Sequence, residues 1–271
     1  MSLSIAFILT VYNRKDITVK SLERLISVTD INKYDYDIFM TDDGCTDGTR
    51  EAVSKISQKI HIIESRGNLY WSGGMRLAWE YANDYKKYDY FIWFNDDALL
   101  YENALDLLFE PINKYRDKVI VSGAFCDNNK NVTYGGRTKD WTWVCPSIGF
   151  PNIYYMNGNL VLIPYNVFQK LGFIEKAYTH DLGDFDYALR AIKSDIPVVL
   201  TSDFVGECER HDNDAYPSFN PNKALRQRFQ ILYGPKFNAC AKFRFDFKYK
   251  GAIKAIKQFV WLNYRTITTL S

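Results

Sequence analysis

YFIWFNDDA, residues 90–98, is the stretch that decides the fold. Five apolar residues come first, and such a run is typical of a short strand that is buried on both faces of a parallel sheet. Asn95, Asp96 and Asp97 follow directly, so polar side chains stand where this strand ends. Open α/β sheets bind their ligands in the crevice outside the carboxyl ends of the strands. The stretch therefore predicts an α/β protein with ligand-binding residues at positions 95–97.

Working outward from this strand, short apolar runs alternate with stretches of helical periodicity through the first half of the chain. This alternation predicts an α/β fold with a mostly parallel central sheet flanked by helices. The expected strands are 4–11, 36–41, 60–64, 90–94, 119–123 and 198–201, with antiparallel pieces near 132–134 and 159–163. The expected helices are 16–27 with Asp16 as its cap, one that follows Asp47, one preceded by Gly73 and Gly74, 102–115 and 184–193.

Composition excludes several classes of protein. The chain has 271 residues, of which 47% are hydrophobic, so it can bury a sizeable core. Its formal net charge is only +2, which argues against a nucleic-acid partner. The five cysteines are odd in number and form no CxxC pair, which favours a cytoplasmic location. The longest stretch without a charged residue, 141–169, contains three prolines, so we expect no membrane-spanning segment.

Charge is distributed unevenly along the chain. Residues 222–271 hold eleven basic residues against one acid, Asp246, a net of +10, which leaves −8 for residues 1–221. We therefore divide the chain into a main N-terminal domain, residues 1–215, and a basic helical C-terminal extension, residues 216–271. In the stretch 251–264, Ile253, Ile256 and Val260 share one helical face. Two interpretations fit equally well: a basic amphipathic helix on an anionic membrane surface, and a helix packed on the acidic body of the same protein.

Several common site motifs are missing. The sequence has no GxGxxG, no GxxxxGK followed by Ser or Thr, no HExxH and no GxSxG. Dinucleotide-binding folds, P-loop proteins, zinc proteases and α/β-hydrolases are therefore disfavoured.

The remaining candidates are acidic residues at the ends of strands. Asp96 and Asp97 would repel each other unless a cation or hydrogen-bond donors offset them, and Mg²⁺ or Mn²⁺ held together with substrate phosphates would do so. The alternative is that one of them simply caps the next helix. His211, in a polar loop, could be a metal ligand or could be solvated. The run DDGCTDGT, residues 42–49, is also ordinary turn chemistry.

Taken in order, these motifs resemble glycosyltransferase family 2, whose members have the GT-A nucleotide-sugar-binding fold. The matching stretches are TVYNR at 10–14, TDDGCTDGT at 41–49, GGMRLA at 73–78, WFNDDA at 93–98 and GDFDYALRA at 183–191. WSGG and DFDY are also similar to the branch that contains bacterial rhamnosyltransferases and related cell-surface glycan enzymes. The resemblance covers residues 3–212.

The resemblance implies a role for individual residues. Asp184 matches the general base of the family's ED motif. Asp97 and His211 match metal ligands, and the implied cofactor is Mn²⁺ or Mg²⁺. The remaining matches imply a binding site for the nucleoside diphosphate sugar donor, formed by Thr10, Tyr12, Asn13, Asp42, Asp43, Arg66, Asn68, Gly74, Asn95 and Asp96. Aromatic residues between Gly135 and Gly158, such as Trp141, Trp143 and Tyr155, are candidates to position the donor sugar and the acceptor.

The sequence departs from the family pattern in three places. Asn95 replaces the first acid of the DxD-type element, and Gly183 replaces the acid that precedes Asp184. The QxxRW signature of processive polymer synthases is absent, which favours the addition of one sugar at each encounter.

These matches predict an inverting, metal-dependent enzyme. It would transfer one sugar from a UDP- or dTDP-linked donor to a saccharide or lipid-linked saccharide in bacterial cell-surface polysaccharide or lipopolysaccharide synthesis. The expected location is the cytoplasm, with contact to the inner face of the cell membrane through the basic C-terminal segment. Two alternatives stay open: a sugar-nucleotide nucleotidyltransferase, and a nucleotide-sugar-binding protein without turnover.

Overall fold

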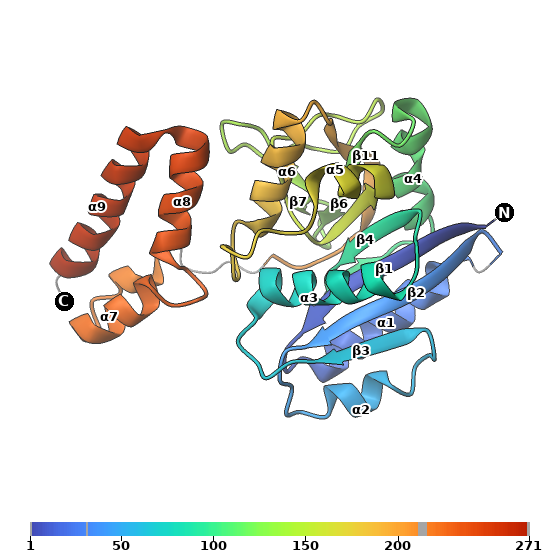
Figure 1. The fold of residues 1–271 in the computed structure, drawn as a ribbon, viewed down its shortest axis with the longest axis horizontal. Coiled ribbons are helices and arrows are strands. Elements are labelled where there is room, and N and C mark those ends of the chain that lie inside the picture. The colour runs from blue at the N-terminus through green and yellow to red at the C-terminus, as the bar shows by residue number, and fades with distance from the viewer. Residues whose placement is uncertain (1, 31, 211–215, 270–271) are drawn as a thin grey trace.

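The computed structural model describes residues 2–30, 32–210 and 216–269, and Figure 1 shows their arrangement. The first half alternates strands and helices: β1 (Leu3–Val11), α1 (Lys15–Val28), β2 (Tyr34–Asp42), α2 (Thr49–Val53), β3 (Ile60–Glu64), α3 (Tyr70–Tyr85), β4 (Tyr90–Phe94), β5 (Leu99–Leu100) and α4 (Ala104–Tyr115). The second half continues with β6 (Ile120–Cys126), β7 (Val132–Tyr134), β8 (Gly136–Arg137), β9 (Tyr155–Met156), β10 (Leu160–Pro164), α5 (Tyr165–Leu171), α6 (Gly183–Lys193) and β11 (Val198–Glu207). The C-terminal region is helical, with a short 3-10 helix (Pro217–Phe219), α7 (Leu225–Leu232), α8 (Ala239–Lys250) and α9 (Ala252–Thr268).

The central sheet has the strand order β3-β2-β1-β4-β10-β6-β11-β5, with β7 paired to β6. Strands β3, β2, β1 and β4 are parallel, whereas β10 runs antiparallel to both β4 and β6. The expected α/β class with flanking helices is therefore confirmed, and both antiparallel pieces occur where the sequence predicted them. Because β1, β2 and β4 are parallel neighbours, their carboxyl ends bring the loops after Val11, Asp42 and Phe94 to one edge of the sheet.

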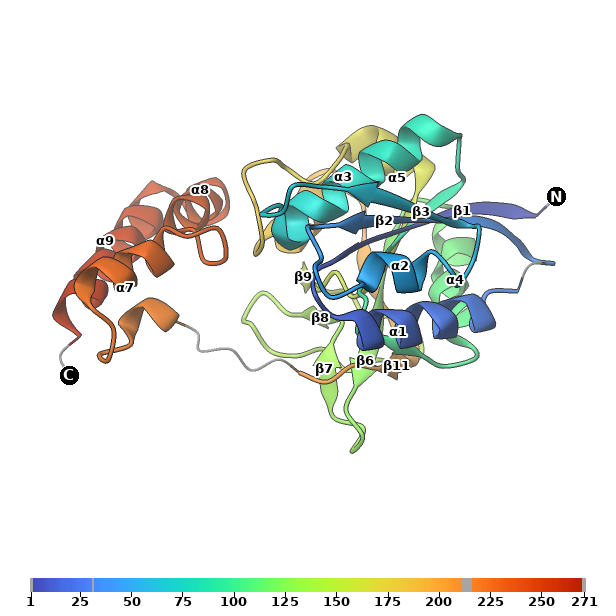
Figure 2. The same ribbon diagram turned by 90° about the horizontal axis from the view of Figure 1, so that it is seen from below.

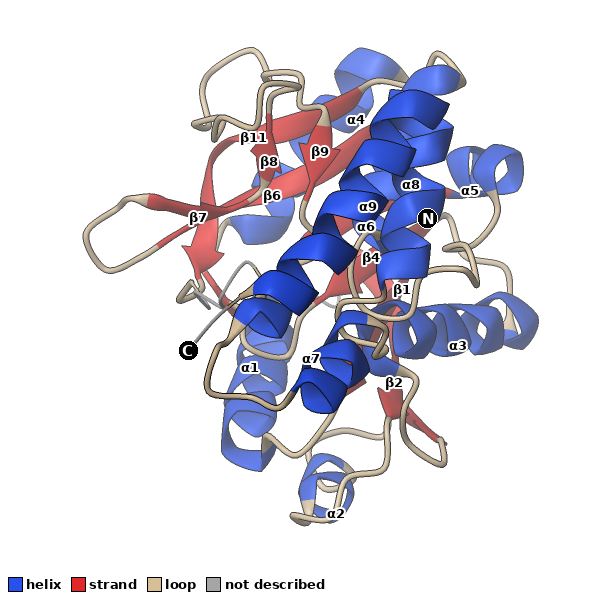
Figure 3. Cartoon of the chain, turned by 90° about the vertical axis from the view of Figure 1, so that its left-hand side faces the viewer, coloured by secondary structure: helices blue, strands red, loops and turns tan. Residues whose placement is uncertain are grey.

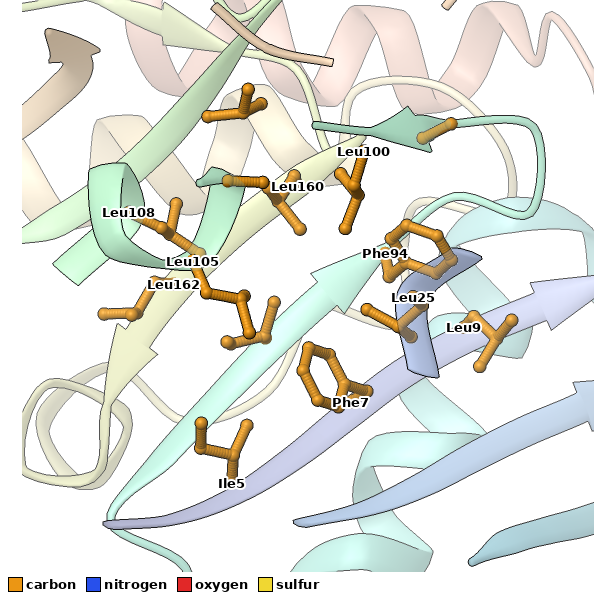
Figure 4. Close-up of a cluster of buried hydrophobic side chains, with 14 of the residues drawn as sticks. Ile5, Phe7, Leu9, Leu25, Phe94, Leu100, Leu105, Leu108, Leu160 and Leu162 are labelled. Carbon is orange, nitrogen blue, oxygen red and sulfur yellow. The ribbon is translucent and has the colours of Figure 1, made fainter. Parts of the chain in front are cut away.

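The core has two layers, one on each face of the sheet. Along β1, Ile5, Phe7 and Leu9 point to one face, where α1 and α4 cover them, and Ala6 and Ile8 point to the other. Figure 4 shows the first layer, and Figure 2 shows helices on both sides of the sheet. Side chains alternate between the faces of a strand, so a strand buried on both sides must be apolar throughout. This explains the continuous apolar runs in the sequence.

Some expected element limits are wrong by a few residues. Asp16 lies in the first turn of α1, and the residue that precedes this helix is Arg14, whose side chain is engaged elsewhere. Gly73 and Gly74 lie inside α3, which begins at Tyr70. The last strand continues to Glu207 instead of ending at Thr201, because β11 pairs with both β6 and β5.

The C-terminal helices pack against the body through α8. Figure 1 shows α8 between α9 and α6, and Figure 3, seen from that side, shows α9 in front. The fully buried carboxylate of Asp186 on α6 accepts hydrogen bonds from Lys248 Nζ at 2.8 Å and Tyr249 Oη at 2.7 Å. Ala241 and Phe245 of α8 join a small hydrophobic cluster with residues of α6 and β9. The extension is thus fixed to the body, whereas the boundary between residues 215 and 216 stays a prediction.

Candidate active site

Asp184 lies in the first turn of α6, where it borders a cavity of about 960 Å³. Its Oδ1 accepts a hydrogen bond from the Phe185 N–H at 2.8 Å, and its Oδ2 accepts one from the Gly158 N–H at 3.2 Å. No basic side chain pairs with Asp184 within the described part of the chain. Burial raises the pKa of this carboxyl from 3.8 to about 7, although the two backbone donors oppose the rise. Asp184 can therefore gain or lose a proton near neutral pH.

Two glycines allow this carboxylate to approach the start of α3. A Cβ at Gly158 would collide with the ring of Trp71, and a Cβ at Gly183 would collide with the side chain of Ser72. Ser72 in turn donates from its Oγ to the His180 carbonyl at 2.9 Å. The close contact between α3 and the loop before α6 thus depends on the absence of side chains at positions 158 and 183.

Asn95 connects the end of β4 to the same cavity. Its side-chain Oδ1 accepts a hydrogen bond from Trp71 Nε1 at 2.8 Å, and its backbone N–H donates to the Asn159 carbonyl at 2.9 Å. Asn95, Trp71, Asn159 and Asp184 all line the cavity. The structure therefore brings the predicted base and the first residue of the DxD-type element to one space.

Asp96 and Asp97 share one guanidinium group. Arg14 donates from Nη2 to Asp96 Oδ1 at 2.5 Å and from Nη1 to Asp97 Oδ2 at 2.9 Å. Thr18 Oγ1 donates to the other oxygen of Asp96, which is only 1% exposed. Burial raises the pKa of Asp96 to about 6, and the charge of Arg14 opposes that rise. A side-chain cation therefore supplies much of the charge compensation that the sequence argument assigned to a metal ion.

Two weak hydrogen bonds connect Asp97 to a residue of the cavity wall. Asn159, which lines the cavity, donates from Nδ2 to Cys208 Sγ at 3.6 Å, and this sulfur lies 3.7 Å from Asp97 Oδ1. The pKa of the Cys208 thiol is raised by burial and by the charge of Asp97, so this group stays neutral. Asp97 thus lies just beyond the cavity wall, on the same side of the molecule as Asp184.

The acidic pair at the end of β2, Asp42 and Asp43, organises two loops. Asp42 accepts from the N–H groups of Gly44 and Cys45 and from Arg50 Nε. Burial alone would raise the pKa of Asp42, but the donors at Cys45 and Arg50 outweigh it and lower the pKa. Asp43 accepts from Ser65 Oγ and from the N–H groups of Leu69 and Tyr70, so it holds the entry to α3. Both carboxylates are nearly fully buried.

The remaining predicted donor residues lie on the surrounding loops. Tyr12 is 59% exposed beyond the end of β1. Asn13 adopts a left-handed backbone conformation, and its Oδ1 accepts a hydrogen bond from the Thr46 N–H at 2.8 Å. Gly74 packs against Thr10 so closely that a Cβ there would collide with the threonine side chain. Arg66 and Asn68 are exposed in the loop between β3 and α3.

The residues present fit a divalent ion through one carboxylate. The part of the chain that the structure describes contains no group of three His, Cys, Asp or Glu residues placed to hold a metal ion. Both carboxylates have protein partners on their two oxygens, but the side chain of Asp96 is 2% exposed, whereas that of Asp97 is 12% exposed. Mg²⁺ and Mn²⁺ are commonly bound by one or two carboxylates together with substrate phosphates. Asp97 suits that mode, and His211 falls outside the described residues.

Sequence reasoning missed several residues of this region. His180 and Asp181 line the cavity, and so do Lys242 and Lys250 of α8. The polar run before α6 was a usable signal for the first two. No local pattern placed α8 at the cavity, because its docking depends on Asp186, sixty residues earlier. Trp141 and Tyr155 line the cavity as expected, whereas Trp143 stacks on Arg137 with 3.6 Å between the guanidinium carbon and the ring centre.

Comparison with known proteins agrees with this geometry. The family model described as Glycosyl transferase family 2 matches residues 6–174. No curated protein matches the chain. A solved mannosyltransferase, PcManGT from Pyrobaculum calidifontis in complex with GDP-Man and Mn²⁺, is similar with a TM-score of 0.57 and 16% identity, over 98% of this chain and 73% of that one. Residues 1–349 of TarS from S. aureus, in complex with UDP-GlcNAc, are similar with a TM-score of 0.59 and 14% identity, over 100% of this chain and 82% of that one.

At 16% and 14% identity, the similarity to these solved structures shows the fold alone, which is GT-A. The family model covers well over half of the chain and extends across β1, β2, β4 and β10. The family model and the GT-A fold thus cover the same strands. The chain therefore belongs to glycosyltransferase family 2 and is a glycosyltransferase.

Proposed function

We propose that this enzyme transfers one sugar at each encounter from a UDP- or dTDP-linked donor to an acceptor hydroxyl, with inversion at the sugar C1. The observation that carries the proposal is Asp184, a carboxylate without a basic partner among the described residues, on a cavity that Asn95 also lines. We place the reaction in the synthesis of bacterial cell-surface polysaccharide or lipopolysaccharide, with a saccharide or lipid-linked saccharide as acceptor. The two similar solved structures, one with GDP-Man and one with UDP-GlcNAc, support a nucleoside diphosphate sugar as the donor.

Asp184 is the proposed general base. The N–H groups of Phe185 and Gly158 hold the carboxylate in one orientation, and the cavity leaves room for an acceptor. As the acceptor hydroxyl attacks the sugar C1, Asp184 takes its proton and the bond from C1 to the diphosphate oxygen breaks. A base with a pKa near the working pH is efficient, and such a group typically contributes about 10²–10⁴-fold in rate. Aromatic residues of the wall, Trp141 and Tyr155, are the proposed platform for the sugars.

The donor nucleotide is proposed to lie across the ends of β1, β2 and β4. Exposed Tyr12 is suited to stack on the base, while buried Asp42 and Asp43 fix the loops that surround the base and the ribose. The complete proposed donor set is Thr10, Tyr12, Asn13, Asp42, Asp43, Arg66, Asn68, Gly74, Asn95 and Asp96.

Asp97, with His211, is the proposed holder of Mn²⁺ or Mg²⁺. When bound, the ion supplies Lewis-acid stabilisation of the charge that develops on the diphosphate leaving group. Arg14 forms an ion pair with one oxygen of Asp97. A second ion pair, with Asp96, holds the same guanidinium group in place. These protein groups orient the carboxylate before the donor arrives.

The proposed location is the cytoplasm, with contact to the inner face of the cell membrane. The C-terminal helix α9 carries the features that support the membrane contact. Its outer side exposes an apolar stripe formed by Ile253, Ile256, Val260, Tyr264 and Ile267. Among the helices within residues 2–30, 32–210 and 216–269, none is both long and apolar enough to cross a bilayer. An apolar stripe on a strongly basic segment is suited to lie in the surface of an anionic membrane.

A vesicle-binding experiment tests the membrane contact. We expect Ile256→Ser with Val260→Ser to abolish sedimentation of the protein with phosphatidylglycerol vesicles. Ile148→Ser, at a loop residue that is 99% exposed, is the matched control and should sediment like the unchanged protein. Equal sedimentation of the double variant would refute the contact.

Donor hydrolysis tests the reaction itself. The protein is incubated with labelled UDP- and dTDP-sugars and Mn²⁺, and we expect slow release of free sugar and the nucleoside diphosphate. A nucleotidyltransferase would instead form or cleave the sugar nucleotide with pyrophosphate. A binding protein would be stabilised thermally by the donor without any release. Either result would contradict the proposed transfer.

A further inference from the structure

We infer that the acceptor carries a phosphate group, which binds in a basic pocket between α8 and α9. This inference rests on the proposed function, because it concerns the substrate that receives the sugar. The pocket has a volume of about 560 Å³. Its wall includes Tyr216, Lys250, Lys254, Lys257, Gln258 and Trp261.

The basic pocket adjoins the cavity of Asp184. Tyr216, Lys250 and Gln258 line both spaces. A molecule that presents a hydroxyl to Asp184 can therefore extend between α8 and α9 without leaving the protein surface. The proposed donor residues at the ends of β1 and β2 line neither space, and Asn95, at the end of β4, lines the cavity but not the pocket, so we assign the pocket to the acceptor.

Positive charge is concentrated at this pocket. Asp246, which is 1% exposed, holds Lys242 and Lys250 at 2.5 and 2.8 Å from its two oxygens, one helical turn away on either side. Lys254 and Lys257 are exposed and have no ion pair with any described carboxylate. The pocket is lined by three lysines, Lys250, Lys254 and Lys257, and by Asp246, so a surplus of two positive charges (three minus one) faces the concave space.

The faces of α9 argue against a merely solvated lysine stripe. Ala255, Leu262 and Thr266 form the buried face of this helix, and the apolar stripe described above forms its exposed outer face. Lys254 and Lys257 lie on a third face, which turns toward the pocket. An ordinary surface helix directs its charges outward and its apolar residues inward. Here the charges line a cleft, which indicates an anionic ligand in it.

Phosphate is the anion that best matches this charge. Each ammonium group offers three donors and acts as a compact point charge, a common way of binding phosphate. A phosphate monoester carries about −1.5 to −2 at neutral pH, whereas a carboxylate sugar carries a single charge. The surplus of two positive charges at the pocket balances the former better.

The test uses glucose 1-phosphate as the probe, with saturating UDP and Mg²⁺ present to fill the donor side. Binding is measured by calorimetry for the full chain and for K254E/K257E. We expect the dissociation constant to rise by at least about tenfold in this variant, because two attractive charges become repulsive. Glucose and glucuronate, the neutral and carboxylate comparators, should bind more weakly than glucose 1-phosphate to the unchanged protein.

The control is K20E/K55E, which makes the same charge change at two exposed lysines outside the C-terminal region. It should bind the probe like the unchanged protein. Equal binding by K254E/K257E, or preference for glucuronate over glucose 1-phosphate, would overturn the inference. Phosphatidylglycerol vesicles added to the bound probe distinguish the source of the phosphate: displacement assigns a lipid headgroup, and lack of displacement assigns a phosphorylated saccharide.

Failure of this inference can be told apart from failure of the proposed function. Hydrolysis of the donor sugar by water needs no acceptor, so the rate at which the unchanged protein hydrolyses UDP-sugar tests the transfer proposal independently of the pocket. If the unchanged protein hydrolyses no donor, the transfer proposal fails, while probe binding still reports on the pocket.

Discussion

The pKa of Asp184 makes a prediction about stability that needs no substrate. Its carboxyl titrates at about 7 in the folded chain and near 3.8 when unfolded. Between these values the unfolded state binds fewer protons than the folded state, so the free energy of unfolding falls as the pH rises from about 4 to about 7. A difference of this size corresponds to at most about 4 kcal/mol. Because Asp184 borders the water of the cavity, we expect roughly half of that.

Asp184→Asn removes this titration. The amide oxygen can still accept from the Phe185 N–H, but the amide nitrogen would face the Gly158 N–H, which costs about 1–3 kcal/mol. At pH 4.5 we therefore expect the variant to be less stable than the unchanged protein. At pH 8 the relation should reverse or vanish, so that the variant gains about 2 kcal/mol relative to the unchanged protein across this range.

Urea unfolding followed by circular dichroism at pH 4.5, 6, 7 and 8 measures this change. Asp140→Asn is the matched control, since this aspartate lies on the same cavity but is exposed. Its effect on the free energy of unfolding should be small, because its side chain is exposed. A constant difference between Asp184→Asn and the unchanged protein at all four pH values would refute the reasoning.

Three further predictions follow from the contacts around the site. Arg14→Met should lower the free energy of unfolding by about 3–5 kcal/mol, because Asp96 is left as a buried charge, and the added change Asp96→Asn should restore part of it in urea unfolding. A loss below about 1 kcal/mol for Arg14→Met would contradict this. Gly158→Ala should displace Trp71 and change the near-ultraviolet circular dichroism spectrum, and an unaltered spectrum would show that the contact is loose. Asp186→Asn should loosen α8 and increase proteolytic cleavage after residue 215, measured by mass spectrometry, whereas an unchanged digestion rate would argue against its anchoring role.

The strands were predictable because burial on both faces leaves a direct mark in the sequence. Residues 90–94 could be recognised as a strand without any partner, since only a doubly covered strand is apolar at every position. Helix starts were less predictable. Asp16 suits a cap in isolation, but the structure uses Arg14 at that point, because its guanidinium reaches the acids after β4. At this helix start, an ion pair between residues more than eighty positions apart decided the structure, and the local preference for an aspartate cap did not.

The candidate site was predictable only where family motifs supplied positions. Asp184 and Asn95, both identified through the resemblance, line one cavity, and their roles stay predictions. The C-terminal wall was not foreseen, because it depends on Asp186 binding Lys248 and Tyr249, and no spacing in the sequence connects these residues. Within the basic segment, α8 packs on the body, while α9, which contains the stretch 252–264, keeps an exposed apolar stripe whose contact with a membrane stays a prediction.

The central claim is that Asp184 removes a proton during sugar transfer. Its most direct test is the rate of UDP-sugar hydrolysis by the unchanged protein and by Asp184→Asn, at pH values from 5.5 to 8.5 with Mn²⁺ and saturating donor. We expect the rate of the unchanged protein to rise with pH through about 7, and the variant to be slower by about 10²–10⁴-fold with unaltered donor affinity. A variant that hydrolyses the donor at the same rate, with the same pH profile, would contradict the account.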